Sequence, residues 1–141
     1  MYISFDIDGV LVDASRRLAS CTRDGELDLS CFLDCAKLAM DAPLPYIELA
    51  NALTKRFRVV VVTGRPEYMR KCTEEQLRRY GLSFNGLFMR PDEDRRPDPL
   101  YKADAISRLI SDGVYILAHF EDNRDTAKAL RARGIDVVLV S

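Results

Sequence analysis

The segment that decides the fold is Met1-Tyr2-Ile3-Ser4-Phe5-Asp6-Ile7-Asp8-Gly9, at the start of the chain. Residues 1–7 form a short, mainly apolar run, which predicts a strand of a buried sheet. Two aspartates and a glycine follow in the order Asp-x-Asp-Gly. The predicted strand therefore ends in two carboxylates, at the edge of the sheet where open α/β folds bind their ligands.

The rest of the chain alternates similar strands with helices. Further apolar runs predict strands over residues 57–63, 114–120 and 135–140, with a weaker one over 87–90. Helical spacing predicts helices over residues 66–80, 99–111 and 124–133, which end before Gly81, Gly113 and Gly134. Asp98 is expected to cap the second of these helices. This alternation indicates an α/β fold of three layers with a parallel five-stranded sheet.

The connection from Asp13 to Lys55 is much longer than one crossover helix needs. Residues 43–54 predict that helix, so residues 14–42 are expected to form a small cap-like insertion after the first strand. Such an insertion would lie over the ligand site. A loop without a role is the alternative, although loops of this length rarely lack one. We therefore expect one domain over residues 1–141.

The composition is that of a globular domain: 141 residues, of which 48% are hydrophobic and 30% charged, with a formal net charge of −1. This charge provides no general attraction to nucleic acid, so a phosphate-bearing ligand would need a local cluster of basic residues. The sequence shows neither a membrane-spanning stretch nor a signal peptide, so a cytoplasmic location without membrane contact is expected. The four cysteines form no C-x-x-C pair and are expected to be reduced thiols.

Polar residues also follow the other predicted strands. Thr63-Gly64-Arg65 follows the second strand, Glu121-Asp122 follows the fourth, and Lys102 lies in the first turn of the helix before it. In a parallel sheet these positions meet at one edge. Two acidic pairs, a hydroxyl and two cations at one place suit phosphoryl transfer.

Each group has a role in that chemistry. Asp6 would attack phosphorus and form a covalent intermediate. Asp8 would serve as general acid and then general base, which is typically worth about 10²–10⁴-fold in rate. Mg²⁺ would be shared by Asp6 and Asp122 and would offset the repulsion between carboxylate and phosphate. Thr63, Lys102 and the backbone N–H groups after Asp6 would bind the oxygens of the transferring phosphoryl group.

Taken singly, these residues have simpler explanations. Asp-x-Asp-Gly also begins calcium loops, but Leu11 and Arg17 stand where an EF-hand needs glycine and glutamate. An Asp-Gly pair can form a plain turn, Asp122 can cap a helix, and a lone lysine is usually solvated. His119 is expected to be a structural residue. The joint order of the motifs at the strand ends favours the catalytic interpretation.

The four motifs Asp6-Ile7-Asp8-Gly9-Val10, Thr63-Gly64-Arg65, Lys102 and Glu121-Asp122 resemble those of the haloacid dehalogenase superfamily of phosphatases. The resemblance covers the chain apart from the insertion. It implies a Rossmann-like core, Mg²⁺ as cofactor, Asp6 as nucleophile and Asp8 as acid and base. It also implies that the metal is bound by Asp6, by the backbone carbonyl of Asp8 and by Asp122.

More specifically, residues 63–82 and 89–102 resemble the 3′-phosphatase domain of phage polynucleotide kinase-phosphatases. It implies substrate-binding roles for Arg17, Gly64, Arg65 and Asp98. The fourth motif of those enzymes usually reads Asp-Asp, so Glu121 is a weaker candidate metal ligand than Asp122. The sequence has no kinase phosphate loop, so kinase activity would need another polypeptide.

The leading hypothesis is a phosphatase for 3′-phosphates of polynucleotide ends, with a separate kinase or ligase as a possible partner. Six arginines are expected to supply a positive rim for this substrate, namely Arg16, Arg17, Arg65, Arg90, Arg95 and Arg96. The alternatives are a nucleotidase, a small-metabolite phosphatase and a non-catalytic module that binds phosphorylated ends. The sequence does not distinguish DNA from RNA or mononucleotide substrates.

Overall fold

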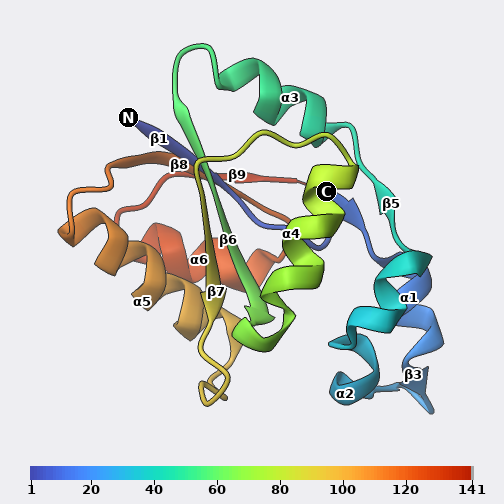
Figure 1. Cartoon of the computed structure of the whole chain (residues 1–141). Coiled ribbons are helices and arrows are strands. Elements are labelled where there is room, and N and C mark those ends of the chain that lie inside the picture. Colours follow the sequence, from blue (N-terminus) through green and yellow to red (C-terminus); the bar gives the residue numbers. More distant parts are fainter. Residues whose placement is uncertain (141) are drawn as a thin grey trace.

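A parallel sheet forms the centre of the molecule in the computed structural model, which describes residues 1–140 (Figure 1). Five strands pair in the order β7-β6-β1-β8-β9, and every pair is parallel. These strands are β1 (Tyr2–Phe5), β6 (Arg58–Pro66), β7 (Gly86–Arg90), β8 (Ile116–Glu121) and β9 (Val137–Leu139). The predicted α/β fold with a parallel five-stranded sheet is confirmed.

Helices cover both faces of the sheet. One face carries α3 (Tyr46–Leu53), the short 3₁₀ helix η2 (Glu67–Met69) and α4 (Arg70–Arg79), whereas α5 (Asp98–Ser111) and α6 (Arg124–Ala132) pack on the other. Alternate residues of a strand point to opposite faces. Val61 accordingly packs with Leu77 of α4, while Val62 packs with Ile106 of α5. The three predicted layers are thus present.

The insertion after β1 consists of short elements beside α4 (Figure 1). They are β2 (Val12–Asp13), α1 (Ser15–Ser20), β3 (Thr22–Arg23), β4 (Glu26–Leu27), α2 (Leu29–Phe32), the 3₁₀ helix η1 (Cys35–Met40) and β5 (Ala42–Pro43). β2 pairs with β5 and β3 with β4, in both cases antiparallel. The pairing of β2 with β5 brings the two ends of the insertion together.

Two disulfides hold this insertion, so the expectation of four reduced thiols was wrong. Cys21 is bonded to Cys31 within the insertion, and Cys35 of η1 is bonded to Cys72 of α4. The sequence separation of Cys35 and Cys72 concealed their proximity, because only the packing of η1 against α4 brings them together. The second disulfide therefore ties the insertion to the core of the domain.

The prediction for the start of the helix over residues 99–111 needs correction. α5 begins at Asp98 itself and its cap is Pro97, so Asp98 does not cap this helix and Lys102 lies in the second turn instead of the first. At the start of α6 the capping side chain is Asn123, which accepts a hydrogen bond from the backbone N–H of Thr126. Asp98 and Asp122 are thereby released for other contacts. Within residues 1–140, no helix is long and apolar enough to cross a bilayer.

Candidate active site

The carboxyl ends of β1, β6 and β8 open into one cleft of about 840 Å³. Eight of the predicted site residues line it: Asp6, Asp8, Thr63, Gly64, Arg65, Asp98, Lys102 and Asp122. Glu121, the weaker metal-ligand candidate, also lines the cleft. Arg17 does not line it, because it lies behind Asp8. The sheet edge therefore assembles the predicted residues although they come from distant parts of the sequence.

Asp6 is buried at the base of the cleft and contacts Lys102. Its Oδ1 accepts a hydrogen bond of 2.8 Å from the backbone N–H of Ile7 and lies 3.0 Å from Nζ of Lys102. Burial raises the pKa of Asp6 well above its ordinary value, and the nearby Glu121 and Asp98 add to this effect, although Lys102 opposes it. A cation placed next to Asp6 would favour its ionised, nucleophilic form.

Glycine is required at two positions around these carboxylates. Gly9 has a φ of 86°, and a Cβ atom there would lie 1.9 Å from Oδ2 of Asp122. At Gly64 a Cβ atom would lie 2.4 Å from Oδ1 of Asp98. The backbone of β6 and the turn after β1 can therefore approach the acidic groups only without a side chain.

Three carboxylates in the cleft have a suitable arrangement for a metal ion. Asp6, Glu121 and Asp122 each offer an oxygen, and these oxygens lie within 4.8 Å of one another. Hard oxygen ligands of this kind fit Mg²⁺, which is bound through one or two carboxylates together with water and phosphate oxygens. Burial and the charge of Glu121 raise the pKa of Asp122 to about 6. Protons will therefore compete with a metal ion at this site.

The carboxylate of Glu121 is held by two side chains and one backbone N–H group. Its Oε1 accepts hydrogen bonds from Nζ of Lys102 at 2.9 Å and from Nε2 of His119 at 3.1 Å. Its Oε2 accepts a bond from the backbone N–H of Asn123. Burial alone would raise the pKa of Glu121, but His119 and Lys102 lower it. Glu121 is thus ionised and orients Lys102 beside Asp6.

His119 has a clear partner on each side, which the sequence analysis missed. Ser4 and His119 are register partners on β1 and β8, and Oγ of Ser4 lies 2.7 Å from Nδ1 of His119. Burial lowers the pKa of His119, so the ring is neutral. Because ionised Glu121 only accepts, Nε2 carries the proton and Ser4 donates to Nδ1. The signal was the i, i+2 spacing of His119 and Glu121, which places both on one face of a strand.

Asp8 is paired with two buried arginines. Nη2 of Arg17 lies 2.6 Å from Oδ1 of Asp8, while Nε and Nη2 of Arg65 donate to Oδ2 and Oδ1 at 3.1 and 2.9 Å. Burial would raise the pKa of Asp8, but Arg65 and then Arg17 outweigh this effect and lower the pKa to about 2. Asp8 is consequently ionised in the substrate-free protein.

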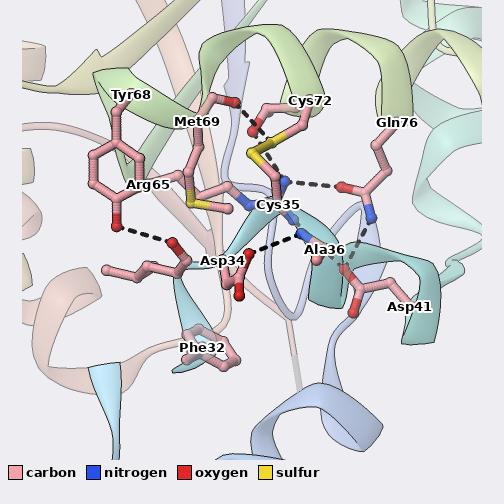
Figure 2. The surroundings of a disulfide bond; sticks show 12 residues. Phe32, Asp34, Cys35, Ala36, Asp41, Arg65, Tyr68, Met69, Cys72 and Gln76 are labelled. Carbon is pink, nitrogen blue, oxygen red and sulfur yellow. Dashed lines mark hydrogen bonds and ion pairs between the residues drawn. A yellow bond between two sulfur atoms is a disulfide. The ribbon is translucent and has the colours of Figure 1, made fainter. Parts of the chain in front are cut away.

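Three buried polar side chains hold these two arginines, and none of the three was predicted. Asp41 accepts hydrogen bonds from Nε and Nη2 of Arg17, both at 3.0 Å, and its side chain is fully buried. Gln76 of α4 accepts from Arg65 and donates to Asp41, as Figure 2 shows. Thr73 also accepts from Arg65. The Cys35–Cys72 disulfide lies beside this network, between η1 and α4.

Asp98, which also lines the cleft, contacts three other side chains. Its Oδ1 accepts from Nη2 of Arg90, and its Oδ2 contacts both Oγ1 of Thr126 and Nζ of Lys102, at 3.2 Å each. This explains why Asp98 does not cap α5, since its side chain turns toward Lys102. Asp98 thereby links the helix pair α5 and α6 to the cleft.

The predicted rim of six arginines is formed only in part: Arg65, Arg90, Arg95 and Arg96 line the cleft, but most of them are paired with carboxylates. Arg17 and Arg65 are buried and pair with Asp8, and Arg90 pairs with Asp98. Arg96 is exposed but pairs with Asp94 and Asp104. Arg16 is exposed outside the cleft. Among the described residues, Arg95 remains as an exposed arginine that lines the cleft and makes no ion pair.

Known families and structures share this architecture. The family model described as the polynucleotide kinase PNKP phosphatase domain matches residues 1–141. No curated protein matches the chain. Among solved structures, a chain of the Pnkp1/Rnl/Hen1 complex superposes with a TM-score of 0.80 at 19% sequence identity. That superposition covers 99% of this chain but 44% of the other, so this chain spans less than half the length of that relative.

Two further structures show how widely the fold is shared. The haloacid dehalogenase-like hydrolase SP0104 from Streptococcus pneumoniae has a TM-score of 0.71 at 15% identity, covering 98% of this chain and 83% of that one. The D,D-heptose 1.7-bisphosphate phosphatase from B. bronchiseptica, complexed with magnesium and phosphate, has a TM-score of 0.56 at 18% identity, covering 98% and 79%. With its full-length family match, the chain belongs to the haloacid dehalogenase phosphatases of the polynucleotide kinase PNKP phosphatase-domain family.

Proposed function

We propose that this phosphatase is a Mg²⁺-dependent phosphomonoesterase that removes 3′-phosphates from polynucleotide ends through an aspartyl-phosphate on Asp6. The observation that carries the proposal is the placement of Asp6 beside Lys102, in one cleft with Glu121 and Asp122. The family match supports the choice of substrate. Bound Mg²⁺ would supply charge neutralisation between the carboxylates and the phosphate.

The residues of the chain divide the reaction into two displacements. A carboxylate oxygen of Asp6 attacks phosphorus, the bond from phosphorus to the 3′ oxygen breaks, and that oxygen takes a proton from Asp8. Water then attacks the phosphorus of the aspartyl-phosphate and gives a proton to Asp8, which releases inorganic phosphate and restores Asp6. Lys102, Thr63 and the backbone N–H groups after Asp6 hold the phosphoryl oxygens.

Asp8 has to be protonated for the first displacement. In the substrate-free protein Arg17 and Arg65 keep it ionised, which suits the second step. We expect the phosphate dianion to compete for the guanidinium group of Arg65, which lines the cleft, and thereby to raise the pKa of Asp8. Arg65 would in this way couple substrate binding to the proton that the leaving oxygen needs.

The insertion over residues 14–42 would act as a small cap in this scheme. It borders the cleft through Leu27, Leu29 and Phe32 and leaves room for a substrate larger than phosphate. One domain over residues 1–141 would then be sufficient for phosphatase activity. A kinase or ligase partner on a separate chain is also part of the proposal, because a structural relative comes from the Pnkp1/Rnl/Hen1 complex. The proposed location is the cytoplasm.

The test is release of phosphate from a 3′-phosphorylated oligonucleotide, with 3′- and 5′-mononucleotides and glycerol phosphate alongside, in Mg²⁺ and in EDTA. Asp6→Asn should abolish release, because an amide is not a nucleophile toward phosphorus. Asp136→Asn is the matched control, since Asp136 is an exposed aspartate outside the cleft. A preference for mononucleotides would indicate a nucleotidase, and a preference for glycerol phosphate a small-metabolite phosphatase. Binding of 3′-phosphorylated ends without any turnover would indicate a non-catalytic module.

A further inference from the structure

Tyr68 presents an exposed aromatic ring inside the catalytic cleft. It lies in η2, three residues after Arg65, and 59% of its surface is accessible to solvent. The same cleft contains Asp6, Asp8 and Lys102. A large aromatic side chain in this position has no part in the phosphoryl transfer described above, so its exposure needs another explanation.

Hydrogen bonds hold both the backbone and the hydroxyl group of Tyr68. The backbone N–H of Tyr68 donates to Oδ1 of Asp92 at 3.0 Å. Its hydroxyl donates to the backbone carbonyl of Leu33 at 2.8 Å, the hydrogen bond drawn from the Tyr68 hydroxyl in Figure 2. Leu33 belongs to the insertion, so Tyr68 bridges the insertion and the core. Because its hydroxyl is already engaged, Tyr68 can offer a ligand mainly the flat face of its ring.

The cleft around Tyr68 is lined by both apolar and charged side chains. Leu27 and Leu29 of the insertion line the cleft and are 39% and 59% exposed. The charged side chains include Arg95, which makes no ion pair among the described residues. The other ring that lines the cleft, Phe32, is covered by the guanidinium group of Arg17 at 4.2 Å. Of these two rings, Tyr68 is the more exposed and has no guanidinium group over its face.

We propose that Tyr68 is a stacking platform for the nucleobase of the nucleotide whose phosphate is removed. The proposal rests on the proposed function and adds a base subsite to it. A nucleobase is flat and has a π-face, and stacking on an aromatic side chain accepts every base, as an enzyme for ends of any sequence requires. The sugar-phosphate part of the same nucleotide would reach Asp6 and Lys102. An apolar group without a π-face would gain nothing specific from the ring.

The experiment compares two substrates that differ only in the base. One is a 3′-phosphorylated oligonucleotide, and the other is the same oligonucleotide with a tetrahydrofuran abasic unit at its 3′ terminus. The ratio of their KM values is measured for the wild type, Tyr68→Leu and Tyr68→Phe. Tyr115→Leu is a control, because Tyr115 is 55% exposed and lies outside the cleft. The 3′-mononucleotide is added to show whether one base is sufficient.

The proposal predicts that the abasic unit raises KM of the wild type by roughly 5- to 150-fold, which is the contribution of one base–aromatic stack. Tyr68→Leu should remove most of this difference, whereas Tyr68→Phe and Tyr115→Leu should retain it. Equal KM values for the two substrates in the wild type would overturn the proposal. A rise of both KM values by the same factor in Tyr68→Leu would overturn it too, since Tyr68 would then only position the insertion.

Binding measurements separate this proposal from the proposed function. With Asp6→Asn, which should not turn over, the dissociation constants of the two oligonucleotides are measured by fluorescence anisotropy. A base-dependent affinity that disappears in the Asp6→Asn, Tyr68→Leu double variant supports the subsite even if the wild type releases no phosphate. Turnover of both oligonucleotides without any base dependence would refute the subsite and leave the phosphatase function standing.

Discussion

Asp41 accepts two hydrogen bonds of 3.0 Å from one guanidinium group, that of Arg17, and all of these atoms are buried. Arg17 in turn holds Asp8. The pairing therefore joins a residue at the end of the insertion to a carboxylate of the candidate active-site cleft. The two buried arginines are thus balanced by two aspartates, of which Asp41 has a fully buried side chain and Asp8 borders the cleft.

Asp41→Asn should reduce both stability and activity. Removing one charge from a buried ion pair leaves the other uncompensated, so we expect a loss of about 3 kcal/mol in the free energy of unfolding. With Arg17 less firmly held, we also expect KM for the phosphorylated substrate to rise. Urea denaturation and steady-state kinetics measure the two effects, with Asp136→Asn as the exposed control. Unchanged stability would show that the network is dispensable.

The Cys35–Cys72 disulfide should contribute more to stability than Cys21–Cys31. It closes a sequence separation of 37 residues and joins the insertion to α4, while the other closes one of 10 within the insertion. Loop-closure entropy predicts about 3–4 kcal/mol for the longer loop. The double variant Cys35→Ser, Cys72→Ser should therefore have the lower melting temperature, with Cys21→Ser, Cys31→Ser as its matched control.

A thiol count under denaturing conditions tests the disulfides directly. If the protein is alkylated at lysis, two disulfides leave no reactive thiol among the four cysteines. Four reactive thiols would restore the expectation from the sequence and would suit a reducing cytoplasm. The same count therefore also bears on the proposed location.

Stabilisation of the protein by Mg²⁺ should depend on pH. The pKa of Asp122 is raised from 3.8 to about 6, so the folded protein binds this proton more tightly than the unfolded chain does. The stabilisation of the fold that comes from this proton on Asp122 is fully present below about pH 4 and is lost as the pH rises through about 6. Mg²⁺ needs the ionised carboxylate, so the increase in melting temperature on adding Mg²⁺ should be larger at pH 7.5 than at pH 5. Equal increases at both pH values would exclude Asp122 as a ligand.

Arg95 should distinguish polynucleotide from mononucleotide substrates. It is the exposed arginine of the cleft that makes no ion pair among the described residues. Arg95→Ala should weaken binding of a 3′-phosphorylated oligonucleotide and reduce its salt dependence by about one counterion, with little effect on a 3′-mononucleotide. Arg96→Ala is the matched control, because Arg96 already pairs with Asp94 and Asp104. Equal effects of the two variants would argue against a backbone contact at Arg95.

Local sequence was sufficient for the strands of the central sheet, for the helices that cover it and for the polar motifs of the cleft, but not for the short elements of the insertion. The run from Val59 to Val62 is apolar throughout because both faces of the sheet are covered, and this pattern identifies a central strand. The order of Asp6, Thr63 and Asp122 at strand ends, with Lys102 in the helix before the last of them, was equally informative. In a parallel sheet, the carboxyl ends of all strands lie at one edge, so residues at those positions are expected to meet.

Other features depended on contacts between distant segments. The sequence by itself determined the parallel α/β core and the set of polar residues at one sheet edge, because periodicity and strand-end position are local properties. Only the tertiary structure decided that Arg17 and Arg65 are buried with Asp8, that Asp41 and Gln76 hold them, and that Cys35 meets Cys72. The contacts of Arg17, Asp41 and Cys35 depend on how the insertion packs against the rest of the domain, and such packing leaves no periodic signal in the sequence.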